Sequence, residues 1–262
     1  FGGTALIAAA TNGRTACVDL LLDAKASISA ADDDGNTALI SAATHGRLSC
    51  VQILVEAKAH INATNTSGKT ALMVASAKGS HGCVRYLIDS KADMEVKDPL
   101  LNGTALIWTA MNGHAACTQV LIDAKADLTA RDHGGKTALM WAAEKGNQEC
   151  LKVLIDAKAD VEAADNVHAL TALMVAAATN RTACLQLLLD ARANMEVRDP
   201  GRRTPLIVSA AIGNVECTRM LLNAGANIQA TDSQGKNACM YASEYGRTEC
   251  LAACVEKLRT QE

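Results

Sequence analysis

Cysteine and histidine are the residue types in this sequence that could do chemistry, because both bind metals and cysteine also acts as a nucleophile or forms disulfides. The 262-residue chain has ten cysteines and six histidines. No two histidines have the spacing of a zinc-binding helix. Cys250 and Cys254 are four residues apart, but no further Cys or His completes a zinc set. We therefore expect no metal site.

Catalytic signatures are missing from the sequence as well. It has no G-x-S-x-G, no P-loop and no dinucleotide-binding fingerprint, and its glycines fit helix ends and turns. We expect a protein that is not an enzyme and that binds no cofactor.

Most of the cysteines occupy one repeated position, each 33 or 34 residues after the last: Cys17, Cys50, Cys83, Cys117, Cys150, Cys184, Cys217 and Cys250. Neighbouring helices pack about 8 to 10 Å apart, whereas disulfide-bonded cysteines need Cα atoms within about 7 Å, so cysteines of adjacent repeats are too distant to pair. We expect these eight, and also Cys239 and Cys254, to be reduced core residues. Free buried thiols predict the cytoplasm or another reducing intracellular compartment.

The elements that carry these residues recur with the same period. A threonine, called the anchor below, recurs at Thr4, Thr37, Thr70, Thr104, Thr137, Thr171 and Thr204, and Asn237 takes its place in the last copy. Both residue types cap helix N-termini. Nine residues later comes glycine, or Asn180 in one copy, which suits the left-handed end of a helix.

A second apolar segment and a polar finger complete each unit. The predicted helices have about nine residues, too few to be stable alone in water, so they must stack. We expect one array over residues 1–262 with repeats 1–31, 32–64, 65–97, 98–131, 132–164, 165–198, 199–231 and 232–262.

The repeat resembles the ankyrin repeat family. The segments DDDGNTALISAATHGR from Asp32, DHGGKTALMWAAEKGN from Asp132 and DPGRRTPLIVSAAIGN from Asp199 follow the family pattern most closely. The resemblance implies an all-α ankyrin-repeat solenoid of about eight helix-turn-helix repeats with β-hairpin-like fingers. It also implies a structural histidine at His114, where a second helix begins.

The chain departs from the family pattern at three positions. Alanine mostly replaces the proline after the anchor, and isoleucine or methionine replaces the first-helix histidine. A basic residue replaces the glycine after six of the second helices, at Lys25, Lys58, Lys91, Lys125, Lys158 and Arg192. A left-handed lysine costs on the order of 1 kcal/mol, so we expect these helices to end differently.

Trp108 and Trp141 stand four residues after consecutive anchors, and they are the only tryptophans. In the ankyrin family this face lines a concave groove. Tryptophan is enriched at binding hot spots, so we predict a partner-binding site there, with a second patch near the last repeat. The predicted binding residues are Leu100, Leu101, Trp108, Met111, Asn112, Trp141, Glu144 and Lys145, and those of the second patch are Tyr241 and Tyr245. Alternatively, the tryptophans lean on the finger bases and fill space.

The leading functional hypothesis is a non-catalytic scaffold that binds a protein or peptide on its concave face. The alternative is a structural subunit or spacer that contacts its neighbours through its ends. A net charge of −3 without charged blocks predicts no nucleic-acid partner, and the absence of a long apolar run predicts no membrane insertion. Because the sequence opens at Phe1 without Met, we expect part of a longer chain or larger complex, with residues 255–262 forming a terminal cap.

Overall fold

Each repeat begins with a short helix that is capped by its anchor residue. The computed structural model describes residues 2–260; Phe1, Gln261 and Glu262, where the first predicted repeat starts and the last ends, lie outside this range. The side-chain oxygen of Thr4 accepts a hydrogen bond from the Ile7 N–H, and the equivalent bond recurs in every repeat, including the one from Met240 to Asn237. The predicted N-caps are confirmed.

Sixteen helices form eight helix-turn-helix pairs in the described residues, which contain no β-strand. The first helices of the pairs are α1 (Ala5–Thr11), α3 (Ala38–Thr44), α5 (Ala71–Lys78), α7 (Ala105–Asn112), α9 (Ala138–Lys145), α11 (Ala172–Ala178), α13 (Pro205–Ile212) and α15 (Ala238–Glu244). The second helices are α2 (Thr15–Asp23), α4 (Leu48–Glu56), α6 (His81–Asp89), α8 (Ala115–Asp123), α10 (Gln148–Asp156), α12 (Thr182–Asp190), α14 (Val215–Asn223) and α16 (Thr248–Arg259). The predicted all-helical repeat fold is confirmed.

The fingers between the pairs are loops that fold back on themselves. Three of them close with an isolated antiparallel bridge: Ala31 with Thr37, Thr64 with Thr70, and Ala164 with Thr171. These single bridges are the β-hairpin-like feature of the described chain.

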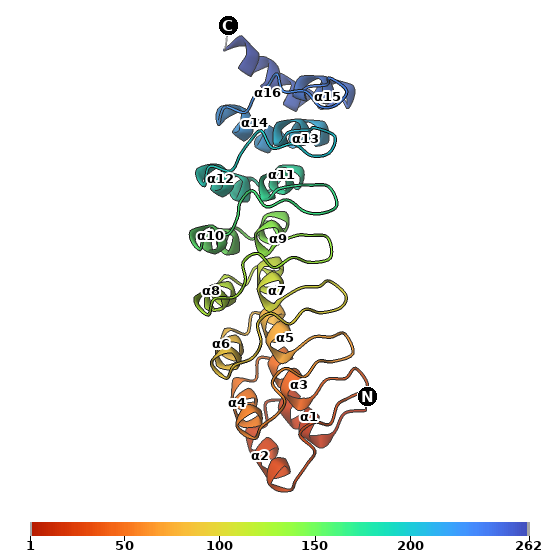
Figure 1. Cartoon of the computed structure of the whole chain (residues 1–262), viewed down its shortest axis with the longest axis vertical. Helices are drawn as coiled ribbons and strands as arrows, with labels where there is room; N and C mark the ends of the chain where they lie inside the picture. The colour runs from red at the N-terminus through yellow and green to blue at the C-terminus, as the bar shows by residue number, and fades with distance from the viewer. Residues whose placement is uncertain (1, 261–262) are drawn as a thin grey trace. The chain divides into compact units, whose positions relative to one another are not determined.

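The chain forms two compact units, Phe1–His133 and Gly134–Glu262. Within each unit, the first helices pack against one another in one row and the second helices in another, and the fingers extend on the first-helix side (Figure 1). That the two units form one array stays a prediction.

Leucine and alanine fill the core between the rows. Leu39 and Leu54, for example, are 1% and 0% exposed, and the equivalent leucines of most repeats are also buried. Seven of the eight repeated cysteines are buried, as predicted, and so is Cys254.

Two cysteines are not core residues as predicted. Cys17 is exposed and Cys239 is half-buried. In the described chain, no helix pair precedes α2 and none follows α15, so the neighbour that buries these positions elsewhere is missing. None of the ten cysteines forms a disulfide.

The expectation about the second-helix ends was wrong. Lys25, Lys58, Lys91, Lys125, Lys158 and Arg192 all adopt the left-handed conformation, with φ between 61° and 69°. At α10, the Lys158 N–H bonds the Ile155 carbonyl and the Ala159 N–H bonds the Leu154 carbonyl. This pair of bonds is the Schellman motif. Because Ala159 is also buried, the motif offsets the strain of a left-handed lysine.

Side chains at the start of the second helices link neighbouring repeats. Nε2 of His114 donates to the carbonyl of Ala77 at 3.1 Å, and Nε of Arg47 donates to the carbonyl of Thr11 at 3.1 Å. The structural role expected of His114 is therefore confirmed, and in the repeat of α3 and α4 an arginine fills it.

Candidate protein-binding face

Trp108 is half-buried in α7 and is held by contacts on two sides. Its indole Nε1 donates a hydrogen bond to Oδ2 of Asp98 at 3.1 Å, and Nζ of Lys69 lies 3.8 Å from its ring centroid. An ammonium group at this distance from an indole ring is a favourable cation–π contact. The ring is thus fixed to the base of the finger, while part of it stays accessible to solvent.

Asp98 organises the finger beside Trp108. Its buried carboxylate also accepts hydrogen bonds from the backbone N–H groups of Leu100, Leu101 and Gly103, at 2.8 to 3.1 Å. Leu101 is half-buried, whereas 74% of Leu100 is exposed. The turn therefore presents Leu100 to solvent at the fingertip.

The remaining predicted site residues of α7 have different surroundings. Met111 is half-buried, and Asn112 is exposed at the end of the helix. The Asn112 carboxamide donates to the Trp108 carbonyl at 2.8 Å, so Asn112 also has a local capping role.

In the second unit, Trp141 lies among charged side chains of its own repeat. Nζ of Lys136 and Nζ of Lys145 lie 4.6 and 5.1 Å from its ring centroid. Glu144 forms ion pairs with both lysines, and the Lys145 pair spans 3.5 Å. Lys136, Glu144 and Lys145 thus surround the half-buried ring of Trp141 with charged side chains.

Tyr241 repeats the Trp108 arrangement in the last repeat. Its hydroxyl donates to Oδ2 of Asp232 at 2.7 Å, and Nζ of Lys236 lies 5.7 Å from its ring centroid. The hydrogen bond to Asp232 raises the pKa of Tyr241 to about 12 and lowers the pKa of Asp232. Tyr245, with 52% of its surface exposed, packs at a ring-centroid distance of 5.7 Å from Tyr241.

Sequence reasoning missed the partners of these rings. Asp98 and Asp232 open the fingers, and Lys69, Lys136 and Lys236 come directly before an anchor. The repeated positions of these residues carried a signal that could have identified them. The structure places Trp108 in the first unit and Trp141 in the second, and their alignment on neighbouring helices stays a prediction.

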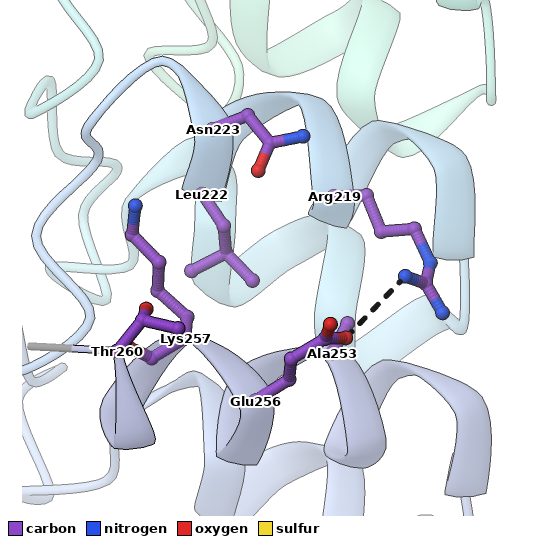
Figure 2. Close-up of a pocket in the computed structure, with 7 residues that line it drawn as sticks. All are labelled: Arg219, Leu222, Asn223, Ala253, Glu256, Lys257 and Thr260. Carbon is purple, nitrogen blue, oxygen red and sulfur yellow. Dashed lines mark hydrogen bonds and ion pairs between the residues drawn. The ribbon is translucent and has the colours of Figure 1, made fainter.

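Hollows also lie away from these residues. Figure 2 shows a polar pocket between α14 and α16, where Arg219 and Glu256 form an ion pair of 3.7 Å and Leu222 and Ala253 contribute to the lining. Another hollow is apolar and is formed by α1 and α2, with Cys17 and the 68% exposed Leu20 in its lining.

Neither a metal centre nor a membrane span is found in the described part of the chain. No three Cys, His, Asp or Glu side chains of residues 2–260 gather as metal ligands. None of the helices in this range has the length and apolar character needed to cross a membrane.

Comparison with known proteins agrees with the repeat pattern. A search of curated protein sequences found no significant match. The family model described as ankyrin repeats, in three copies, matches residues 1–65, 72–165 and 173–258. These segments cover most of the chain and include both units. The chain belongs to the ankyrin repeat family.

Proposed function

We propose that this chain is a non-catalytic scaffold that binds a protein or peptide through its first-helix face. This face comprises the residues four to eight positions after each anchor together with the fingertips. Ankyrin repeats are generally protein–protein interaction modules. The observation that carries the proposal is the accessible aromatic ring, bordered by lysine, at the same position of three repeats: Trp108, Trp141 and Tyr241.

The side chains of this face suggest the chemistry of the partner. Rings and exposed aliphatic residues such as Leu100 offer apolar contact, and buried aromatic contacts dominate many interfaces. Lys69 places an ammonium group beside Trp108, whereas the ammonium groups beside Trp141 and Tyr241, those of Lys136 and Lys236, also form ion pairs with Glu144 and Glu244. We propose an extended peptide or loop that combines apolar side chains with acidic ones.

The rings take part in the fold as well as being available to a partner. The hydrogen bonds from Trp108 to Asp98 and from Tyr241 to Asp232 support the alternative reading that aromatic residues brace the fingers. Bracing also gives a binding surface fixed side chains, and a fixed surface loses less entropy when it binds.

Two measurements on Trp141→Ala test the proposal: titration with a peptide that the wild-type chain binds, and thermal melting. If Trp141 binds the partner, the substitution should weaken binding by at least about 2 kcal/mol with little change in the stability of the chain. If the ring is purely structural, the substitution should lower the free energy of unfolding by about 3 to 5 kcal/mol, and the folded fraction should bind as before. The second result would remove Trp141 from the proposed site.

A second candidate function is a spacer or subunit that contacts neighbours through its ends. The apolar hollow of α1 and α2 favours it, because Leu20 and Cys17 are exposed there. If this function is correct, substituting Leu20 should abolish assembly through the ends. If it is not, the substitution should leave binding through the first-helix face unchanged.

The proposed role requires neither catalysis nor a cofactor, and we propose the cytoplasm or another reducing compartment. Burial raises the pKa values of Cys83, Cys184 and Cys217 to about 11. These thiols therefore stay protonated and unreactive near neutral pH, which suits packing residues. A rapid reaction of these three thiols in the folded chain would contradict this assignment.

A further inference from the structure

One pair of core positions changes together in the last repeat. The positions two and seventeen residues after the anchor are both leucine in the other seven repeats: Leu6 with Leu21, Leu39 with Leu54, Leu72 with Leu87, Leu106 with Leu121, Leu139 with Leu154, Leu173 with Leu188, and Leu206 with Leu221. In the eighth repeat these positions are Cys239 and Cys254. Two thiols thus replace two leucines, one in each helix of a repeat, that are buried in most other repeats.

The two thiols lie next to each other. Cys239 is near the start of α15, Cys254 is in the middle of α16, and these helices pack against each other (Figure 1). The two side chains are close enough to interact and to shift each other's pKa. Cys254 is 0% exposed, whereas Cys239 is half-buried and therefore accessible to a small reagent.

Their environment separates the two thiols chemically. The hydrogen bond from Cys254, aided by the backbone N–H of Cys239 itself, lowers the pKa of Cys239 to about 7. The same bond and burial raise the pKa of Cys254. Near neutral pH a substantial fraction of Cys239 is thus thiolate, whereas Cys254 stays a thiol. Cys83, Cys184 and Cys217 lack this activation, because burial raises their pKa values to about 11.

We propose that Cys239 and Cys254 form a redox-sensitive pair, which a peroxide converts into a disulfide within the eighth repeat. The Cys239 thiolate attacks one peroxide oxygen, the O–O bond breaks, and the products are a sulfenic acid on Cys239 and, after proton uptake, water or an alcohol. The Cys254 sulfur then attacks the Cys239 sulfur. The S–O bond breaks, and the departing hydroxide takes the Cys254 proton as water. The two thiols lose two electrons, and the peroxide gains them.

This pair differs from the cysteines that repeat along the chain. Those cysteines stand on successive second helices, whereas Cys239 and Cys254 belong to the two helices of one repeat. A disulfide between them would tie α15 to α16, and α15 also carries Tyr241, with Tyr245 as the residue that caps its end. The inference does not depend on the proposed binding function.

Peptide mapping of the full chain tests the proposal. The reduced chain is treated with hydrogen peroxide, remaining thiols are alkylated under denaturing conditions, and the chain is cleaved with trypsin. Cys239 falls in the peptide 237–247, and Cys254 falls in 248–257 together with Cys250. We expect the loss of two of the ten thiols and a link between these two peptides.

Three variants identify the bond. Cys250→Ser should keep the link, and Cys254→Ser should lose it while leaving a Cys239 sulfenic acid that dimedone traps. The double variant Cys239→Leu with Cys254→Leu restores the leucine pair of the other repeats and should lose no thiol. Ten intact thiols in treated wild-type chain, or a link that persists in Cys254→Ser, would overturn the proposal.

The reactivity of Cys239 provides a second measurement that does not depend on disulfide formation. Iodoacetamide should label Cys239 in the folded chain with a pH midpoint near 7. At neutral pH it should label Cys239 roughly ten-fold or more faster than Cys184. A midpoint equal to that of the urea-unfolded chain would show that Cys239 is not activated and would overturn the first step.

Discussion

The indole Nε1 of Trp108 donates a hydrogen bond to Oδ2 of Asp98 across 3.1 Å. Tyr241 makes the matching bond to Asp232 across 2.7 Å. In both repeats an aromatic donor in the first helix is joined to the aspartate that opens the finger. The rings are therefore oriented by buried or nearly buried carboxylates, and their accessible parts keep a fixed position.

Trp108→Phe should destabilise the chain while keeping an aromatic ring. The substitution removes the indole donor from the buried carboxyl group of Asp98, and leaving a buried acceptor without one of its partners costs about 1 to 3 kcal/mol. Urea unfolding followed by circular dichroism measures the loss. Wild-type stability in this variant would show that the bond does not anchor the ring.

Tyr241→Phe should lower stability in a pH-dependent way. Because the folded-state pKa of Asp232 lies below its usual 3.8, its carboxylate contributes stability above this value, and the contribution disappears as the pH falls through the folded pKa. The variant should be less stable by about 1.5 to 3 kcal/mol at neutral pH, with the difference shrinking below about pH 4. A difference that is constant from pH 7 to pH 2 would contradict the assigned bond.

Ser76→Ala should stabilise the chain. Ser76 is 0% exposed, and its hydroxyl has no hydrogen-bond partner; alanine occupies this position in six of the other repeats. Removing an unsatisfied buried hydroxyl should add about 1 kcal/mol to the free energy of unfolding.

Ser209→Ala is the control for this prediction. Its hydroxyl donates to the Leu206 carbonyl and accepts from Thr218, both at 3.0 Å, so the same substitution should destabilise there. Equal effects in the two variants would show that hydrogen bonding does not decide the outcome.

Lys158→Gly should stabilise the end of α10. Glycine adopts the left-handed conformation of this position without steric cost, and the gain should reach at most about 1 kcal/mol, because glycine also loses more backbone entropy on folding. Lys152→Gly, inside the same helix, should instead cost about 1 kcal/mol. Thermal melting compares the two, and destabilisation by both would contradict the strain argument.

The fold was predictable from sequence because the same sequence signals recur in each repeat. Threonine or asparagine caps, glycine or asparagine after the first helix, and apolar periodicity point to the same helix pairs in all eight copies. The prediction failed for Lys158 and its equivalents because propensity alone omits the Schellman bonds and the buried alanine that follows. It failed for Cys17 and Cys239 because burial depends on a neighbouring repeat, which a position inside one repeat does not reveal.

The candidate face was predictable only in part. The repeated position of Trp108, Trp141 and Tyr241 marked the rings, and this position is readable from sequence. The hydrogen bond from Trp108 to Asp98 and the cation–π contact of Lys69 depend on how a finger folds back over a helix. Side-chain spacing along the chain does not give that geometry.

Binding measurements on two matched leucines test the central claim most directly. Leu100 is 74% exposed on a fingertip of the proposed face, and Leu20 is 68% exposed in the hollow of α1 and α2. A peptide selected from a random displayed library on the full chain is titrated by calorimetry against Leu100→Ala and Leu20→Ala, with melting curves to confirm that both variants stay folded. We predict that Leu100→Ala weakens binding about ten-fold, or about 1.4 kcal/mol, and that Leu20→Ala binds like wild type. Weaker binding by Leu20→Ala with unchanged binding by Leu100→Ala would contradict the account and favour contact through the ends.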